Sequence, residues 1–301
     1  MIISKKNKIC MKCAQDTRGI RIKFVDANHI GIIHCCFREK EFTGIMSIDE
    51  IMKMSNNEFW TYLLESYKEI PSNHKYQPDY YCETDQNCYY NDKYLDSVTV
   101  TTFKHCNIKC KMCMVSDNSF MPYNKDVEIY FKLLNMLKGH NLRCIGLTGN
   151  GEPFLPKTET FEYLESLNSN DCEFVDFTTN TLLLNKEDID RLARINNENI
   201  KLKIMCSCSA ITPETYYKIH SNNNFDKVIN NIRYMAEIGL TPLISFVVQS
   251  ENLHELSMLR DFWKDYNIAG LAVHPIVGFN GNSIANSPEF INFFNMKKYD
   301  Y

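Results

Sequence analysis

Residues 106–113 read CNIKCKMC and place three cysteines, Cys106, Cys110 and Cys113, in the spacing C-x3-C-x2-C. Three thiols are one ligand short of a closed four-ligand site. Cysteine thiolates are the usual protein ligands of iron–sulfur clusters, and three of them can hold a cubane whose fourth iron stays open. A zinc knuckle is the alternative, although zinc sites usually pair C-x2-C with a second ligand pair. The missing ligand could also come from another part of the chain.

The motif directly follows a stretch rich in β-branched residues, SVTVTTF at 97–103. From there onward, strand-like and helix-like segments alternate, which implies a parallel sheet with right-handed connections. The strand-like segments are 97–103, 143–149, 173–179, 201–207, 242–249 and 270–277, and the helix-like segments are 125–137, 160–167, 186–195, a helix that begins at Pro213, 225–238 and 251–263. Six such units predict an α/β fold, a partial (β/α)6 TIM-type barrel with its active site at the carboxyl ends of the strands.

The first 95 residues do not follow this alternation. FVDANHIGIIHCCF at 24–37 predicts a β-hairpin, and SIDE at 47–50 fits a capping box before one helix through 51–70. This region also holds six cysteines: Cys10, Cys13, Cys35, Cys36, Cys82 and Cys88. We therefore predict a small cysteine-rich α+β domain at 1–95, followed by the barrel at 96–301.

Composition excludes several classes of function. The 301 residues carry a net charge of −4 and no block of Lys or Arg, so no nucleic-acid partner is expected. The sequence contains neither a signal-peptide core nor an apolar run long enough for a membrane span, which predicts a cytoplasmic protein without membrane contact. Without a secretory signal, thirteen cysteines indicate metal or cluster ligands rather than disulfides.

On the motif at 106–113, the sequence resembles the radical SAM enzymes, whose signature is C-x3-C-x2-C after the first barrel strand. The resemblance implies a [4Fe-4S] cluster on Cys106, Cys110 and Cys113, with the open iron chelated by S-adenosylmethionine. In that family, one electron from the cluster cleaves the sulfonium, and the resulting 5′-deoxyadenosyl radical abstracts a hydrogen atom from the substrate.

Segments after the second and third strands extend the resemblance. TGNGEP at 148–153 resembles the family segment that binds the methionine amino group, and its matching residues are Gly151 and Glu152. TTNTLLL at 178–184 is similar to a family loop in which Thr179 and Asn180 match, while Thr181 replaces the usual Gly. Read alone, both segments are turn signals.

Segments after the fourth and fifth strands add further cofactor candidates. SCSAITPETYYKIH at 207–220 looks like a family pattern in which Ser207 contacts ribose. Ser209 stands where Asp is usual, and His220 replaces an Arg that often meets the S-adenosylmethionine carboxylate. His220 could take that role if protonated, or it could simply end a helix. The resemblance also suggests Gln249, Asn252 and, against adenine, Met112.

The six cysteines before the barrel resemble the SPASM/twitch modules of this superfamily, which hold an auxiliary iron–sulfur cluster. Gly31 to Cys36 fits the G-x4-C hairpin of such modules, with Cys10 or Cys13 before it and Cys82 and Cys88 after it. These modules normally follow the barrel, whereas this one precedes it. A structural zinc site is the alternative.

The cysteines dispersed through the barrel are expected to be mostly core residues. Cys206 and Cys208 alternate with Ser207 and should face the helices if Ser207 faces the barrel interior. Cys144 and Cys172 are candidates for a thiol that donates hydrogen to a substrate radical.

The resemblance implies an enzyme that reductively cleaves S-adenosylmethionine, with a peptide as the expected substrate and ribosomal peptide modification as its role. The alternatives are a dehydrogenase of a sugar or aminocyclitol and, in a different class, a non-catalytic Fe–S sensor or zinc-binding module. The expected partners are the peptide or small-molecule substrate and an electron donor such as flavodoxin or ferredoxin.

Overall fold

The computed structural model of the chain describes residues 19–34, 42–68, 95–113, 121–147, 151–276 and 284–295. These residues form a nine-stranded sheet with the order β3-β2-β1-β4-β5-β6-β7-β8-β9. The six predicted strands are present and parallel, and the prediction of a partial barrel is confirmed. They are β4 (Ser97–Val100), β5 (Leu142–Gly146), β6 (Cys172–Thr179), β7 (Lys201–Ser207), β8 (Leu243–Val248) and β9 (Gly270–Pro275).

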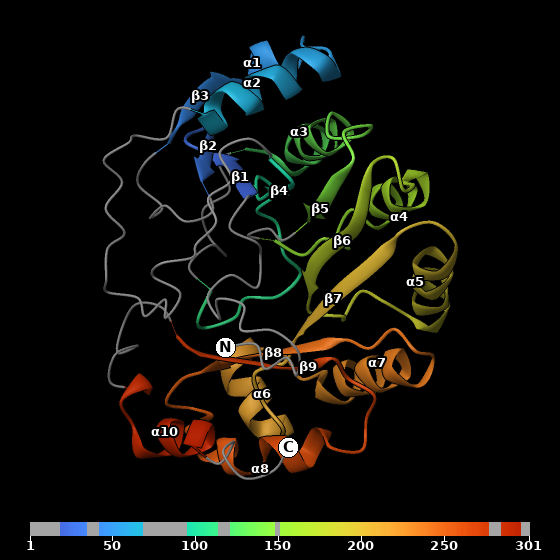
Figure 1. Ribbon diagram of the computed structural model, residues 1–301. Helices are drawn as coiled ribbons and strands as arrows, with labels where there is room; N and C mark the ends of the chain where they lie inside the picture. Colours follow the sequence, from blue (N-terminus) through green and yellow to red (C-terminus); the bar gives the residue numbers. More distant parts are fainter. Residues whose placement is uncertain are drawn as a thin grey trace.

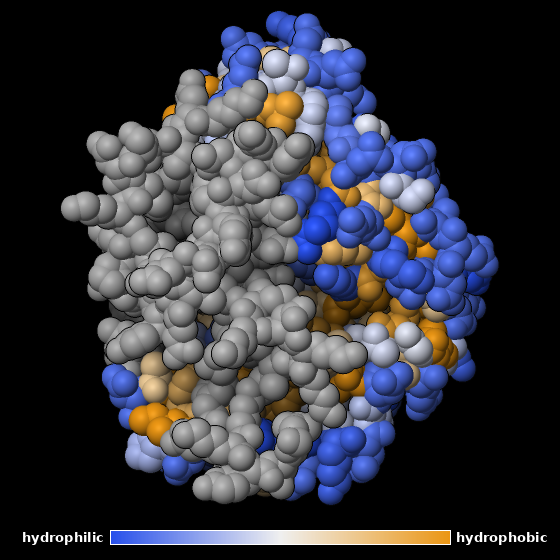
Figure 2. All heavy atoms as spheres, in the orientation of Figure 1, coloured by the Kyte–Doolittle hydropathy of each residue, from blue (hydrophilic) through white to orange (hydrophobic). Residues whose placement is uncertain are grey.

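The helices follow the predicted order, with boundaries that differ by a few residues. In Figure 1, α3, α4, α5 and α7 lie along the outer side of the curved sheet, and Figure 2 shows hydrophilic residues over this side with hydrophobic residues visible between them. The helices are α3 (Tyr123–Asn135), α4 (Lys157–Ser166), α5 (Lys186–Glu198), α6 (Pro213–His220), α7 (Phe225–Glu237), α8 (Leu256–Trp263) after a 3-10 turn η1 (Leu253–Glu255), and α10 (Pro288–Asn295). Within the described ranges, every helix is too short or too polar to cross a bilayer.

Alternation along β7 separates the two faces of the sheet. Leu202, Ile204 and Cys206 are buried, whereas Lys201 and Lys203 are exposed. The Cys206 Sγ lies 3.9 Å from the Sδ of Met235 in α7, so this row of side chains packs against the helices. Because successive side chains of a strand point to opposite faces, Ser207 faces the barrel interior while Cys206 faces the helices.

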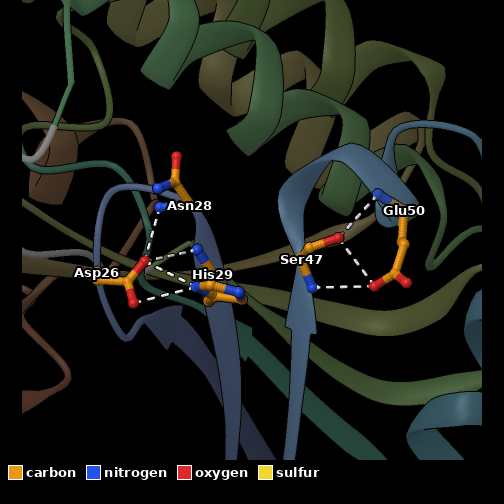
Figure 3. A network of polar contacts seen from close by, with 5 residues as sticks. All are labelled: Asp26, Asn28, His29, Ser47 and Glu50. Atoms are coloured by element: carbon orange, nitrogen blue, oxygen red, sulfur yellow. Dashed lines mark hydrogen bonds and ion pairs between the residues drawn. The ribbon is translucent and has the colours of Figure 1, made fainter.

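The predicted hairpin consists of β1 (Gly19–Phe24) and β2 (His29–His34), and β3 (Gly44–Ser47) pairs with β2. Asp26 organises the turn, because its Oδ1 accepts the backbone N–H groups of Asn28 at 2.7 Å and His29 at 2.9 Å (Figure 3). The Asn28 hydrogen bond, followed by that of the His29 side chain, lowers the pKa of the Asp26 carboxyl. The side chain thus holds a turn that its residue type favours.

The single helix predicted over residues 51–70 is wrong, because the chain forms two helices there. The capping box at Ser47 and Glu50 is present, but the helix it begins, α1, ends after one turn (Ile48–Ile51; Figure 3). The longer helix α2 (Asn56–Lys68) begins after Ser55, which exchanges hydrogen bonds with Glu58 in the same reciprocal way. A second capping box, SNNE at 55–58, therefore divides the segment.

The hairpin continues the barrel sheet. β1 pairs in parallel with β4, with Ile22 opposite Val100, and the Thr101 hydroxyl donates to the Ile22 carbonyl at 3.0 Å. Buried residues of β1, β2, α1 and α2 belong to the same apolar core as those of the barrel strands. The predicted division near residue 95 thus falls within one continuous sheet, and the assignment of residues 1–95 to a separate domain stays a prediction.

Candidate active site

Polar residues gather where five parallel strands end. Cys106 follows β4, Glu152 follows β5, Asn180 follows β6, Ser209 follows β7 and Gln249 follows β8. The carboxyl ends of parallel strands meet at one edge of the sheet, and this edge carries the active site in barrel enzymes. The structure thus brings together at one edge residues that the sequence analysis selected from five separate segments.

Residues 106–113 are here called the cluster loop. Its three cysteines are free thiols. Cys106 and Cys113 are exposed and Cys110 is partly buried. Burial raises the pKa of the Cys110 thiol to about 12, so without a metal this sulfur keeps its proton. Among the described residues, no group of three His, Cys, Asp or Glu side chains is arranged to hold one metal ion.

Gly151 and Glu152 pack on His105, the residue directly before the cluster loop. The Glu152 N–H donates to the carbonyl of His105 at 2.8 Å. A Cβ at Gly151 would lie 2.4 Å from that same carbonyl oxygen, so only glycine fits this approach. Burial raises the pKa of the Glu152 carboxyl to about 7, against the lowering effect of its hydrogen bonds.

Glu152 also ties the loop after β6 to this site. Its Oε1 accepts the Thr179 hydroxyl at 2.6 Å, and its Oε2 accepts the Asn180 N–H at 2.8 Å. The Asn180 amide in turn donates to the Oδ1 of Asn107 at 2.8 Å and lies 3.8 Å from the Cys106 Sγ. Asn180 therefore contacts the cluster loop directly, whereas Thr179 acts through Glu152.

His220 reaches the cluster loop from the last turn of α6. Its ring is fully buried, and its Nδ1 lies 3.1 Å from the Cys110 Sγ. The Ser209 N–H donates to its Nε2 at 3.3 Å. Burial lowers the pKa of the His220 imidazole to about 4, so the ring is neutral near pH 7. Of the two roles considered from the sequence, binding a carboxylate as a cation is therefore disfavoured.

Gln249 and Asn252 differ in how their side chains are used. Asn252 is fully buried, and its amide donates to the carbonyls of Ser209 and Val247, each at 2.8 Å. Its Oδ1 accepts the Gln249 N–H at 2.8 Å, which makes Asn252 a brace for the loop after β8. The Gln249 Nε2, in contrast, is buried without a hydrogen-bond partner among the described residues. Gln249 is therefore the better cofactor candidate of the two.

Other predicted residues lie in less decisive positions. Ser207 ends β7 on the inner face and pairs with Ser245 of β8, and Met112 is partly buried in the cluster loop. Cys144 is the middle residue of β5 and Cys172 is the first residue of β6, so neither lies at the strand ends that carry the cluster loop. Burial raises the pKa of each of these two thiols to about 12. Their role as hydrogen donors stays a prediction.

The structure adds contacts that the sequence analysis missed. Asp126 in α3 is fully buried and accepts the Lys104 N–H at 3.0 Å, two residues before Cys106. Lys111 forms an ion pair with Glu251, and its N–H donates to the Ile219 carbonyl at 2.8 Å. Asp126 gave no sequence signal of its contact, because an acidic residue in the first turn of a helix is common. Asn107, next to Cys106, was the one local signal of such loop contacts, since Asn side chains often form hydrogen bonds with nearby groups.

Part of the predicted site lies outside the described residues. This holds for Cys10, Cys13, Cys35, Cys36, Cys82 and Cys88, and for positions 148–150 of the Gly-rich segment. The ligand set of the auxiliary centre therefore stays a prediction.

The model of the family described as the radical SAM superfamily matches residues 100–262, more than half of the chain. The chain belongs to the radical SAM superfamily. This match covers the cluster loop, the strands β5 to β8 and all but the last residue of α8. Membership implies a [4Fe-4S] cluster and S-adenosylmethionine, and it favours the cluster over the zinc alternative at Cys106, Cys110 and Cys113.

Relatives and solved structures agree on this core. A probable GTP 3',8-cyclase from Saccharolobus islandicus is 30% identical over 166 residues, which are 54% of this chain and 51% of the relative. The chain thus spans about half the length of the curated relatives it matches. Streptococcus suis SuiB bound to S-adenosylmethionine superposes with a TM-score of 0.52 at 16% identity, over 93% of this chain and 70% of SuiB. Native anSMEcpe with bound AdoMet and Kp18Cys peptide gives 0.50 at 17%, over 66% and 59%.

The residues present fit both groups. Three thiols on one loop leave one coordination position of a cubane open. Near them lie a buried acid, Glu152, and the amide of Gln249, whose hydrogens have no acceptor among the described residues. S-adenosylmethionine contains a charged amine, which can donate to the acid, and a nucleoside, which can accept from the amide.

Proposed function

We propose that the protein cleaves S-adenosylmethionine reductively and abstracts a hydrogen atom from a peptide. The bound cluster would supply the electron, and the bound cofactor would supply the 5′-deoxyadenosyl radical. The choice of a peptide is supported by the fold likeness to anSMEcpe, which was solved with bound AdoMet and the Kp18Cys peptide, together with the extent of the likeness to SuiB bound to S-adenosylmethionine. The superposition on SuiB spans 93% of the chain. The GTP 3',8-cyclase match, in contrast, covers 54% of the chain.

Each candidate residue has a proposed task. Cys106, Cys110 and Cys113 would ligate the cluster, and Glu152 would accept a hydrogen bond from the methionine amine. Gln249 would donate its unused amide hydrogens to the nucleoside part, Ser207 would contact ribose and Met112 would pack against adenine. Thr179, Asn180 and Asn252 would support these groups through the hydrogen bonds described above. Enclosure of the radical by the barrel and the N-terminal region would exclude water.

The six cysteines of residues 1–95 would hold an auxiliary Fe–S cluster in a SPASM/twitch-like arrangement. Such a cluster could bind the substrate or take up an electron after its oxidation. Iron and sulfide counts test this part, because one cubane contributes about four irons and two contribute about eight. A count near four in the fully loaded protein would contradict the auxiliary cluster.

A nucleotide is the second candidate substrate, since curated relatives at up to 30% identity are named probable GTP 3',8-cyclases. Dehydrogenation of a sugar or aminocyclitol is a further alternative that the sequence analysis left open. We further propose a cytoplasmic location and flavodoxin or ferredoxin as the electron donor.

One anaerobic assay separates these functions. The purified protein is reduced with dithionite, S-adenosylmethionine is added, and 5′-deoxyadenosine is quantified by chromatography. Parallel samples contain no addition, GTP, 2-deoxystreptamine, or synthetic peptides encoded by short open reading frames that flank the gene. We expect the peptides to raise 5′-deoxyadenosine formation and to change mass. Stimulation by GTP or the aminocyclitol alone would overturn the peptide proposal, and no 5′-deoxyadenosine with an intact cluster would overturn the enzymatic function.

A further inference from the structure

The contact between His220 and Cys110 joins two segments that are far apart in the chain. His220 is the last residue of α6, its ring is 0% exposed, and it stacks on Tyr216 with ring centroids 4.4 Å apart. The Nδ1 atom faces the Cys110 Sγ at 3.1 Å, which is within hydrogen-bond distance for sulfur. The ring therefore cannot turn toward the barrel interior without leaving both neighbours.

The other ring nitrogen fixes the tautomer. The Nε2 atom accepts the Ser209 N–H at 3.3 Å, so it carries no proton. A neutral imidazole with an accepting Nε2 has its proton on Nδ1 and donates from there. The hydrogen bond at Cys110 therefore runs from the His220 N–H to the sulfur.

Ser209 is itself fixed by hydrogen bonds, so the position of its N–H group relative to the His220 ring is well defined. Its carbonyl accepts the Asn252 amide at 2.8 Å, and its hydroxyl oxygen accepts the Val247 N–H at 3.1 Å. On the opposite side, the Lys111 N–H donates to the Ile219 carbonyl at 2.8 Å and fixes the cluster loop to the same end of α6. Both partners of the His220 ring are thus positioned by backbone contacts of their own.

We propose that His220 is a positioning residue that donates an N–H···S hydrogen bond to the cluster ligand Cys110 and thereby raises the reduction potential of the cluster. A hydrogen bond withdraws electron density from a thiolate sulfur, which favours the reduced cluster. This role rests on Cys110 being a ligand, as the proposed function requires, and it leaves the S-adenosylmethionine carboxylate to other groups.

Two amide variants test the roles of the two His220 ring nitrogens separately. The amide nitrogen of Asn lies near the position of Nδ1, so His220→Asn keeps a donor toward Cys110. Gln reaches the position of Nε2, so His220→Gln keeps an acceptor for the Ser209 N–H and loses that donor. Both variants remain polar and similar in size, which limits their effect on folding.

The first measurement is the midpoint potential of the cluster whose EPR signal changes when S-adenosylmethionine is added. We expect His220→Gln to shift this potential to more negative values by more than the scatter of replicate titrations, and His220→Asn to stay near the wild type. Loss of the cluster in His220→Gln alone would support the same role. An unchanged potential in His220→Gln, or equal shifts in both variants, would overturn the proposal.

The second measurement does not depend on the cluster or on activity. Metal-free protein with ¹⁵N-labelled histidine is studied by two-bond nitrogen–proton correlation, and the His220 signals are assigned by their absence in His220→Asn. We expect a proton on Nδ1 and none on Nε2, whereas a proton on Nε2 would overturn the proposal. If the enzyme assay fails while these signals and the potential shift appear, the proposed function is wrong and the role of His220 stands.

Discussion

Thr181 adopts a left-handed backbone conformation, with φ +63°, although its side chain is branched at Cβ. This conformation costs a non-glycine residue about 1–2 kcal/mol, because its Cβ approaches the neighbouring carbonyl. The Thr181 hydroxyl is also buried without a hydrogen-bond partner among the described residues. The backbone is held in place nevertheless, since the Thr181 carbonyl accepts the Asn231 amide at 2.9 Å.

We therefore expect Thr181→Gly to be more stable than Thr181→Ala by about 1 kcal/mol. Both variants remove the buried hydroxyl, but only glycine removes the clash at positive φ. Urea unfolding of the metal-free variants gives the two free energies of unfolding. Equal values, or a more stable alanine variant, would mean that the turn after β6 imposes no strain on Thr181.

Asp126 makes the stability of the protein depend on pH. Burial raises the pKa of its carboxyl from 3.8 to about 6, while the Lys104 N–H and the neighbouring charges of His105 and Lys104 lower it. Since the folded pKa exceeds the unfolded one, protonated Asp126 contributes its full stability below pH 3.8. That contribution is lost as the pH rises through 6.

The matched variant is Asp126→Asn, which keeps an acceptor for the Lys104 N–H and does not titrate. Between about pH 4 and about pH 7, we expect the wild type to lose about 2 kcal/mol of unfolding free energy relative to this variant. Urea unfolding of both metal-free proteins across this range provides the measurement. Parallel pH profiles would show that Asp126 keeps an ordinary pKa in the folded protein.

At the scale of elements, the segment after β5 supports the cluster loop by close backbone contact. A Cβ at Gly151 would lie 2.4 Å from the oxygen and 2.9 Å from the nitrogen of His105, and neither backbone atom can move without shifting Cys106. We expect Gly151→Ala to lose about 1–3 kcal/mol of stability and much of its iron after reconstitution. Thermal unfolding and iron analysis measure the two effects.

Gly239→Ala is the control for this prediction. Gly239 has φ +87° and nothing within 4 Å of its Cβ position, so alanine there costs backbone energy at a distance from the site. It should lower the melting temperature while iron content stays at the wild-type level. Equal iron loss in both variants would indicate that general destabilisation, and not the Gly151 contact, governs cluster retention.

Local signals made the order of elements predictable, and their limits explain the errors. Alternating burial in β7 and the Thr212–Pro213 start of α6 are properties of adjacent residues, so the sequence displays them directly. The break before α2 had a local signal too, in the Ser55–Glu58 pair, but the periodic apolar residues around it outweighed this signal. Element boundaries depend on such competing caps.

Contacts between distant segments could not be predicted in the same way. Cys110 and His220 are far apart in the chain, and nothing in either segment indicates that one faces the other. Residue types indicated the proposed cluster ligands at 106–113, because three thiols at this spacing favour an iron–sulfur cluster, with a zinc site as the alternative. The supporting roles of Asn180 and His220 follow only from the packing of the loops after β6 and β7.

At the scale of the whole molecule, the described strands form one sheet, although the sequence suggested two parts. An alternating strand shows which of its faces is buried, but it does not show which edge it will pair with. β1 pairs with β4 in parallel, and its Ile22 is 0% exposed. The apolar core consequently continues from the hairpin into the barrel.

This continuity predicts that the strands unfold together, even without metal. Ile22→Ala should cost about 2–5 kcal/mol, as expected for a large-to-small change in a packed core. Because β1 and the barrel share that core, the loss should appear in a single cooperative transition. Hydrogen exchange in the chelator-treated, full-length protein should lose protection in β4 to β6 as much as in β1.

Ile45→Ala is the matched control, because Ile45 lies in β3 of the same hairpin and is 55% exposed. It should change the unfolding free energy by less than about 0.5 kcal/mol. Two separate transitions in the metal-free protein, with only β1 to β3 affected by Ile22→Ala, would instead mean that residues before 95 unfold as a unit of their own. The auxiliary metal centre would then be needed to stabilise that unit. A single shared transition would instead mean that the pairing of β1 with β4 stabilises it.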